Sequence, residues 1–297
     1  MNLPSENDVI ARLVAWAEAD DSIRALVLTS SRARDDGNAD LLSDYDVVVA
    51  IRDPEAFAHD DEWKSAYGRP LVHWGDEDVT EGSTTHFRGV VYEDGTRIDY
   101  TLWPDQLLDK ITESDVLLAD LDVGYRVLVD KDERTSRWHE PTHSAHVPAK
   151  PTQEQYEAMV HEFWWSTTYV AKSLWRGEVF FAKFMLDHDA KFVALRRFLE
   201  WKLELAHDWS LRPGSHGRGL EQLLPSETWE ALAATYVGTD IDDNWNALFS
   251  TTALFREVAI EVGQALGFRY PEEVDDGVTA HLAAVRNLAQ RDEPRKD

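Results

Sequence analysis

The stretch from residue 26 to residue 51 constrains the fold more than any other part of the chain. An apolar, β-branched run ends at Thr29, a polar loop follows, and a second apolar run begins just after Asp44. Two such runs separated by turn residues predict two neighbouring strands. The second strand opens with Asp44 and Asp46, and residues i and i+2 of a strand project from the same face. Two carboxylates on one face are unfavourable unless a cation joins them.

A third acid lies in a later strand. The turn signal at residues 93–95 predicts a hairpin, and Asp99 lies among apolar neighbours in the run 96–102 that follows it. A charged side chain within an apolar strand requires a partner. Magnesium prefers carboxylate oxygens and usually brings substrate phosphates with it. The residues therefore predict a magnesium and phosphate site built on Asp44, Asp46 and Asp99.

This pattern resembles the nucleotidyltransferase superfamily of DNA polymerase beta type. That superfamily has a Gly-Ser pair after a strand, then a loop, then an alternating pair of acids, then a lone acid on a neighbouring strand. Ser31 is the motif serine here, Asp44 and Asp46 form the acid pair, and Asp99 is the third acid. Ser30 stands where the superfamily usually has glycine, which lets a backbone approach a triphosphate closely.

Composition limits the class of protein. A chain of 297 residues with 43% hydrophobic residues and 12 Trp predicts a folded globule of one or two domains. The absence of cysteine excludes disulfides, thiolate catalysis and cysteine-based zinc sites. A net charge of −26 argues against nucleic-acid partners and favours cationic ones, although solubility or salt adaptation also explains an acidic chain.

Location and assembly are also expectations at this point. There is no apolar run of about 18 residues and no basic, then apolar, leader at the N-terminus, so we expect a soluble cytoplasmic protein without membrane contact. Nothing in the chain demands a partner subunit, and we expect a monomer.

The domain boundary is predicted where the composition changes. Residues 131–151 hold three prolines and show no periodicity, whereas the chain beyond them is helical in pattern. We predict an α/β domain over 1–135, a linker over 136–151 and an all-α domain over 152–297. The first is a mixed β-sheet domain with flanking helices, and the second is a helical bundle.

Individual elements follow from local signals. We expect a short strand over 71–74, a helix over 152–175 and a second long helix over 178–209. Asp240 or Asp242 is expected to begin a helix that reaches residue 266 and ends at Gly267.

A closer resemblance is carried by four stretches together. They are residues 30–51, 95–104, 161–187 and 217–271. The chain is similar there to the aminoglycoside 6-adenylyltransferases, which modify streptomycin. The resemblance implies transfer of AMP from Mg-ATP, with two magnesium ions, to the streptidine 6-hydroxyl of streptomycin, release of pyrophosphate, and antibiotic resistance.

The resemblance and the chemistry of the side chains together give candidate roles. Asp44 and Asp46 are expected to hold magnesium, and Asp99 to complete the metal site and accept the proton of the acceptor hydroxyl. The candidates for binding ATP are Ser31, Arg32, Lys172, Lys202, Arg218 and Tyr236. The candidates for binding the cationic acceptor, whose guanidinium groups pair with carboxylates and stack on aromatic rings, are Glu162, Trp165, Tyr169, Glu178 and Asp187.

Two alternatives remain open. The acceptor can be a lincosamide, another small molecule or a protein side chain. The chain can also be a degenerate nucleotidyltransferase fold that only binds a partner, although such a protein is expected to have lost its acids.

Overall fold

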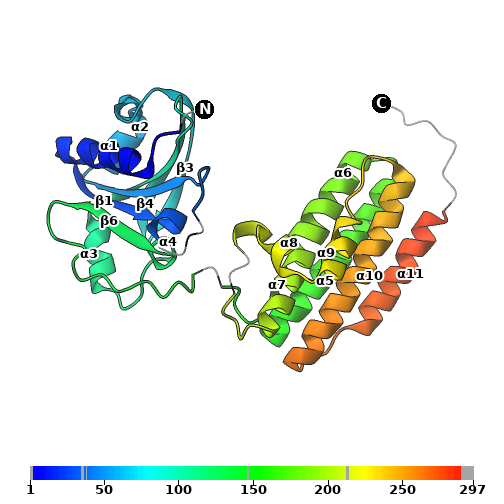
Figure 1. Cartoon of the computed structure of the whole chain (residues 1–297). Helices are drawn as coiled ribbons and strands as arrows, with labels where there is room; N and C mark the ends of the chain where they lie inside the picture. The colour runs from blue at the N-terminus through cyan, green and yellow to red at the C-terminus, as the bar shows by residue number, and fades with distance from the viewer. Residues whose placement is uncertain (1–2, 35–36, 38, 146, 212–213, 289–297) are drawn as a thin grey trace. The chain divides into compact units, whose positions relative to one another are not determined.

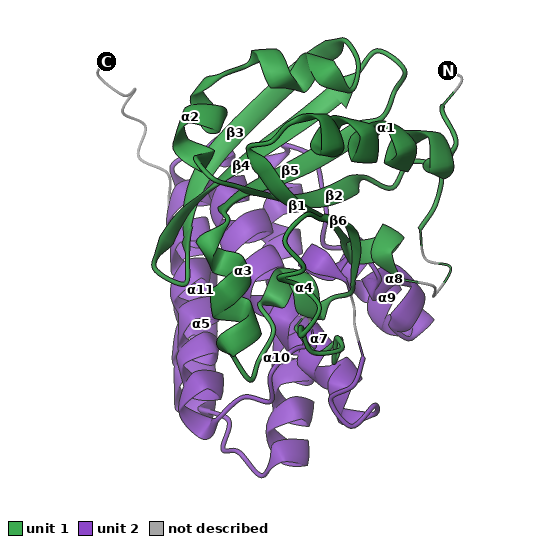
Figure 2. Ribbon diagram, turned by 90° about the vertical axis from the view of Figure 1, so that its left-hand side faces the viewer, with its two compact units in different colours: residues 1–145 green, residues 146–297 purple. Residues whose placement is uncertain are grey.

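The computed structural model describes residues 3–34, 37, 39–145, 147–211 and 214–288. The chain forms two compact units, Met1–Ala145 and His146–Asp297, which Figure 2 colours separately. The border between them falls within the predicted linker 136–151. In the part of the chain that the structure describes, no helix is long and apolar enough to span a bilayer.

The first unit is built on one mixed sheet (Figure 1). Its strands, among the described residues, are β1 (Ile23–Thr29), β2 (Tyr45–Ile51), β3 (Pro70–Thr80), β4 (Ser83–Tyr92), β5 (Arg97–Pro104) and β6 (Tyr125–Asp130). Their order is β3-β4-β5-β2-β1-β6, and only the pair of β2 with β5 is parallel. The prediction of a mixed sheet with flanking helices is confirmed.

Helices cover both faces of this sheet. They are α1 (Glu6–Ala19), α2 (Pro54–His59), α3 (Gln106–Glu113) and α4 (Ala119–Asp122), with short 3₁₀ helices η1 (Ser30–Ala33) and η2 (Glu62–Ala66). Alternate residues of β2 belong to two cores: Val47 and Val49 pack with α1 and α2, whereas Val48 and Ala50 pack with α3 and α4. The uninterrupted apolar run of β2 is therefore explained by burial on both faces.

Strand β3 is longer than its sequence indicates. The strand expected over 71–74 is present, but its predicted length is wrong, because β3 pairs with β4 from Pro70 to Thr80. Its second half contains Asp76, Glu77 and Asp78, which have low strand propensity. An exposed edge strand tolerates such residues, and edge charges also discourage pairing with other chains.

Asp122, at the end of α4, binds the backbone of residues 142–145 at the end of the first unit. Its carboxylate accepts hydrogen bonds from the backbone N–H groups of Thr142, Ser144 and Ala145, at 2.6, 2.9 and 3.0 Å. The hydroxyl groups of Thr142 and Ser144 donate as well. Burial alone raises the pKa of Asp122, but these hydrogen bonds outweigh it and hold the pKa at about 2.

Because its pKa is depressed, Asp122 stabilises the folded state by an amount that depends on pH. The contribution is complete above the ordinary carboxylate pKa and is lost as the pH falls from about 4 towards 2. We expect Asp122→Asn to lower the free energy of unfolding by about 2 kcal/mol at neutral pH, and the difference from wild type to shrink over that acid range. Urea denaturation at a series of pH values measures it, with the exposed Asp115→Asn as control. A difference that stays constant with pH would contradict the assignment.

The second unit is helical. Its described elements are α5 (Gln153–Trp175), α6 (Val179–Lys183), the π-helix η3 (Phe184–Leu195), α7 (Arg196–Leu205), the 3₁₀ helix η4 (Ser215–Gly217), α8 (Leu220–Leu223), α9 (Ser226–Ala233), α10 (Ile241–Leu266) and α11 (Glu272–Arg286). Thr152 caps α5 in a capping box, Asp240 caps α10, and Gly267 ends α10 with a φ of 74°. These end signals were readable in the sequence.

Helix packing explains the aromatic content of this unit. The rings of Phe163 on α5 and Phe255 on α10 stack with centroids 3.5 Å apart. Tyr156 donates its hydroxyl to the carbonyl of Ala259 at 2.7 Å, and a Cβ at Gly263 would lie 2.6 Å from that hydroxyl oxygen. Glycine is therefore required for α10 to approach α5 closely. The predicted long helix over 178–209 is present as α6, η3 and α7, with wider π-helical turns in the middle.

Candidate active site

The three predicted carboxylates meet at one end of the sheet in the first unit. Asp46 on β2 pairs directly with Asp99 on β5, and the two strands are parallel. Directly paired residues of neighbouring strands project from the same face, and Asp44 precedes Asp46 by two residues. The sequence therefore folds so that all three acids face the same side. Their catalytic and metal-binding roles stay predictions.

This arrangement is electrostatically unfavourable for Asp46. The pKa of its carboxyl is raised to about 6, chiefly by burial and then by the negative charges of Asp99 and Asp44, and a hydrogen bond from Ser30 and the charge of Arg97 offset only part of this rise. A raised carboxyl pKa means that the folded chain disfavours the charged form. Perturbed carboxylates of this kind mark candidate functional sites.

Arg97 is a member of the site that the sequence reasoning missed. Its guanidinium donates to both oxygens of Asp99, from Nε to Oδ1 at 3.1 Å and from Nη2 to Oδ2 at 3.0 Å. Its Nε also lies 3.6 Å from Oδ2 of Asp44. The signal was available, because Arg97 and Asp99 are i and i+2 of one strand and must share a face.

The donor set of the site suits a hard divalent cation, since it consists of carboxylate oxygens. Among the described residues, no group of three or more His, Cys, Asp or Glu side chains is arranged to hold a metal ion as it stands. The Arg97 guanidinium instead donates to both oxygens of Asp99 and approaches Asp44. A metal ion on these oxygens would take the place of the Arg97 charge.

The loop after β1 carries the motif serine. Ser30 and Ser31 lie in η1, and Ser30 has a φ of 61°, in the left-handed region that favours glycine. Its backbone N–H donates to the carbonyl of Gly124 at 3.1 Å. The loop therefore adopts a glycine-type conformation although serine stands at position 30. A left-handed non-glycine residue is a source of strain of about 1 kcal/mol or more.

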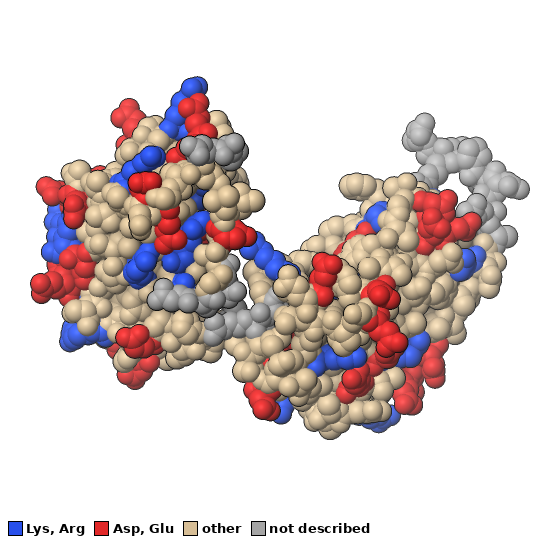
Figure 3. All heavy atoms as spheres, viewed as in Figure 1, with Lys and Arg blue, Asp and Glu red and all other residues tan. Residues whose placement is uncertain are grey.

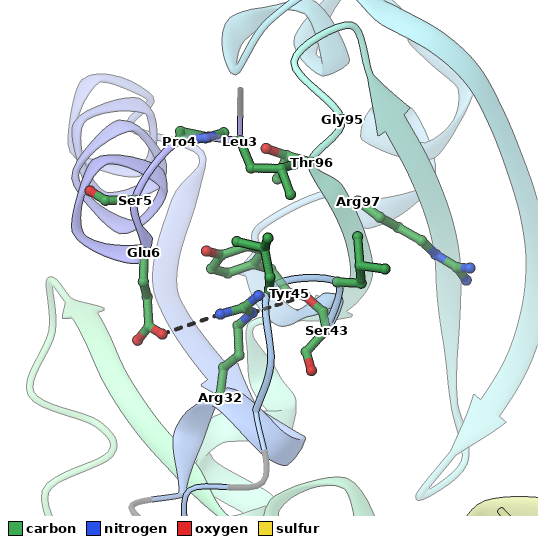
Figure 4. A pocket seen from close by; sticks show the side chains of 12 residues that line it. Leu3, Pro4, Ser5, Glu6, Arg32, Ser43, Tyr45, Gly95, Thr96 and Arg97 are labelled. Atoms are coloured by element: carbon green, nitrogen blue, oxygen red, sulfur yellow. Dashed lines mark hydrogen bonds and ion pairs between the residues drawn. The ribbon is translucent and has the colours of Figure 1, made fainter. Parts of the chain in front are cut away.

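Arg32 has structural partners in this fold, which Figure 4 shows. Its guanidinium donates to the carbonyl of Ser43 at 2.7 and 3.0 Å and to the carboxylate of Glu6 at 3.3 Å, and it lies over the ring of Tyr45 at 4.1 Å. These contacts fix the loop before β2 against α1. A phosphate contact by Arg32, as predicted, requires some of these bonds to be exchanged.

The cavity beside Arg32 is small. Its volume is about 150 Å³, and its lining includes Glu6, Arg32, Tyr45 and Arg97 (Figure 4). Pockets for nucleotide-sized ligands usually measure about 300–1,000 Å³. We therefore assign this cavity to the packing of the loop rather than to a substrate.

The predicted residues of α5 lie together on the second unit. Trp165 is 64% exposed, its ring meets that of Tyr169 at 5.7 Å, and Nζ of Lys172 lies 4.2 Å from the centre of the Tyr169 ring. These three residues line a groove of about 370 Å³ between α5 and α11, together with Trp175 and His281. Glu162 is exposed on the same helix. The groove combines aromatic walls with positive charge.

Asp187 has two lysine partners. Lys183 and Lys191 each approach one of its oxygens at 2.8 Å. Burial raises the pKa of Asp187, but hydrogen bonds from both lysines outweigh it and the pKa is lowered. Binding of a cationic acceptor by Asp187 would require exchange of one of these lysine bonds, and its assigned contact with the acceptor stays a prediction. Tyr236 is 54% exposed, and its ring covers the ammonium of Lys191 at 4.2 Å.

The remaining predicted residues of this unit are dispersed. Lys202 forms an ion pair with Glu261 at 2.6 Å. Arg218 follows η4 and is exposed, and Glu178 precedes α6. Their assigned contacts with ATP or acceptor stay predictions.

Surface charge is distributed rather than gathered. On the face of each unit seen in Figure 3, acidic and basic side chains are interspersed. Recognition of a cationic molecule by this face must therefore depend on particular carboxylates and not on the net charge of −26 alone.

Comparison with known proteins identifies the family. The family model described as streptomycin adenylyltransferase matches residues 3–285. The chain belongs to this family. The aminoglycoside 6-adenylyltransferase of Campylobacter jejuni is 31% identical over 90% of this chain and 91% of its own length. That of Bacillus subtilis (strain 168) is 28% identical over 95% of this chain and 98% of its own.

A solved structure also aligns with the chain. It is that of an aminoglycoside 6-adenyltransferase from Bacillus subtilis, with 25% identity, coverage of 96% of this chain and 100% of its own, and a TM-score of 0.48. The family match spans nearly all of both units. The predicted resemblance is confirmed, and the streptomycin adenylyltransferase family consists of nucleotidyltransferase enzymes.

Proposed function

We propose that this chain transfers AMP from ATP to a hydroxyl group of an aminoglycoside, with streptomycin and its streptidine 6-hydroxyl as the leading acceptor. The observation that carries the proposal is the pairing of Asp46 with Asp99 beside Asp44 in a chain of this family. An intact acid row argues against a degenerate fold that only binds, since such a fold has no reason to keep a repulsive cluster.

In the proposed reaction the acceptor oxygen attacks the α-phosphorus of ATP and pyrophosphate leaves. Asp99 accepts the proton of the hydroxyl, for which it must come within hydrogen-bond reach of the acceptor. Asp44, Asp46 and Asp99 would hold magnesium, which would neutralise charge on the phosphates. Ser31 offers its hydroxyl and backbone N–H to the phosphates.

The second unit is proposed to supply binding groups. Trp165 and Tyr169 present exposed rings, and Lys172 adds a positive charge beside them. Aromatic faces bind both nucleobases and guanidinium groups, so the two ligands are alternatives for this groove. Lys202, Arg218 and Tyr236 remain further candidates for ATP, and Glu162 and Glu178 for the acceptor.

The test of reaction and acceptor is one assay. The purified chain is incubated with Mg-ATP and, separately, with streptomycin, spectinomycin, kanamycin or lincomycin, and both pyrophosphate release and the mass of the antibiotic are followed. We expect streptomycin to gain the mass of AMP and pyrophosphate to appear in equal amount. Transfer of AMP to lincomycin alone would show that the acceptor is a lincosamide and not an aminoglycoside. No transfer to any of the four antibiotics would overturn the proposal.

A further inference from the structure

One row of residues crosses the sheet from the acids to its edge. Asp46 on β2 pairs with Asp99 on β5, Asp99 pairs with Gly89 on β4, and Gly89 pairs with Trp74 on β3. Directly paired residues project from the same face. Trp74 therefore faces the same side as the two acids, two strand spacings, or about 10 Å, from Asp99.

Gly89 leaves the floor between Trp74 and Asp99 open. A Cβ at this position would lie 3.1 Å from Oδ1 of Asp99 and 3.2 Å from the ring of Phe87. The two distances show that Phe87 and the carboxylate of Asp99 border the space above Gly89. A glycine within a strand weakens the sheet and often marks a place where a ligand approaches the backbone.

An aromatic platform borders this floor on its outer side. The rings of Trp74 and Phe87 have their centres 5.7 Å apart, and Trp74 is 63% exposed. Asp76 lies two residues after Trp74, pairs with Phe87 and is exposed, so it adds a carboxylate to the same face. An exposed indole next to carboxylates is the combination that binds ammonium and guanidinium groups.

We propose that Trp74, Phe87 and Gly89 form the subsite for the acceptor, with a cationic group of the aminoglycoside over Trp74 and the reactive hydroxyl at Asp99. The occupant is the acceptor rather than ATP, because the exposed carboxylate of Asp76 shares the face of Trp74, and a carboxylate there attracts a cationic group and repels phosphates. This inference rests on the proposed function and adds the place and the specificity-determining residue for the acceptor. Trp74 acts by binding, whereas Asp99 acts on the proton.

The experiment compares acceptor and ATP kinetics in four proteins. They are the wild type, Trp74→Ala, Trp74→Phe and the control Val79→Ala, which changes an exposed apolar residue of β3 on the opposite face. We expect Trp74→Ala to raise KM for streptomycin by at least about tenfold and to leave KM for ATP unchanged. Trp74→Phe retains a ring and should recover most of the loss, and Val79→Ala should match the wild type.

Binding measured without turnover separates this inference from the proposed function. Titration calorimetry gives Kd for streptomycin in the wild type and Trp74→Ala, and we expect a loss of at least about tenfold. Kd and KM within about twofold of the wild type in Trp74→Ala would overturn the subsite alone. Streptomycin that binds and depends on Trp74, but gains no AMP, would overturn the proposed reaction and support the subsite. No binding of any aminoglycoside by the wild type would overturn both.

Two further readouts keep the interpretation specific. Gly89→Ala places a methyl group on the floor, 3.1 Å from Oδ1 of Asp99 and 3.2 Å from the Phe87 ring, so that one of these neighbours must shift. We expect it to lower kcat/KM for streptomycin by at least about tenfold while KM for ATP is kept. Gel filtration of Trp74→Ala checks self-association. A change of oligomeric state with unchanged streptomycin binding would assign Trp74 to contact between copies and overturn the subsite.

Discussion

Replacement of Asp99 by asparagine is expected to lower kcat for AMP transfer by about a thousandfold. The change is nearly isosteric, but it removes the group that accepts the proton of the acceptor hydroxyl and one negative charge from the site. Asp46→Asn is expected to be at least as damaging, since it removes the central member of the acid row. The measurement is kcat for AMP transfer to streptomycin under saturating Mg-ATP.

A matched control distinguishes chemistry from loss of charge. Glu93→Gln neutralises an exposed acid in the turn before β5, where it pairs with Arg69 at 2.9 Å. We expect its kcat to stay within about twofold of wild type, because an exposed ion pair contributes little. Activity in Asp99→Asn equal to that of Glu93→Gln would remove Asp99 from the mechanism.

Stability measurements on the same variants add an independent check. Asp46 faces Asp44 and Asp99, so its charge opposes folding, and Asp46→Asn should be at least as stable as the wild type. An inactive variant that is not destabilised would show that the acid is kept for function. Thermal denaturation of Asp46→Asn and the wild type in magnesium-free buffer gives this comparison. A large loss of stability would instead make Asp46 structural.

The acid row was predictable because it depends on short-range rules. Alternation along a strand places Asp44 with Asp46, and the hairpin signal places Asp99 on a strand nearby. The same alternation places Arg97 beside Asp99, and this consequence was available but not drawn. Local geometry was therefore sufficient to predict which acids lie together. It was also sufficient to predict that Arg97 pairs with Asp99.

Other features depended on partners that are distant in the sequence. Trp74 belongs to the acid face only through the register of β3 with β4 and of β4 with β5, which a single sequence does not specify. The second half of β3 was not predicted as a strand, because its acidic residues have low strand propensity. Its conformation is instead decided by pairing with β4. In contrast, the partners of Asp187 were readable, since Lys183 and Lys191 stand four residues to either side of it.

The core of the second unit contains a buried polar network that no sequence pattern predicted. Asp275 on α11 is 3% exposed, and Arg256 on α10 donates to both of its oxygens at 2.5 Å. Tyr270 and Thr279 donate their hydroxyl groups to the same carboxylate at 2.8 and 3.0 Å. Nε1 of Trp164 on α5 donates to the Tyr270 hydroxyl at 3.1 Å, so one carboxylate links three helices.

Asp275→Ala is therefore expected to lower the free energy of unfolding by about 3–5 kcal/mol. Three donors lose their acceptor in a buried place, and the Arg256 charge is left without its partner. The neighbouring Asp276→Ala, at an exposed position, should change stability by no more than about 0.5 kcal/mol. Urea denaturation followed by circular dichroism measures both variants.

Hydrogen exchange locates the effect within the chain. In Asp275→Ala, amide protection should fall in α5, α10 and α11, where the network has its members, and should be retained in the sheet of the first unit, which has a separate core. Asp275→Asn keeps one acceptor oxygen and should lose less stability than the alanine variant. A loss below about 1 kcal/mol in Asp275→Ala would mean that apolar packing, such as that of Phe163 and Trp164 on α5 against Phe255 on α10, holds the helices together without the polar network.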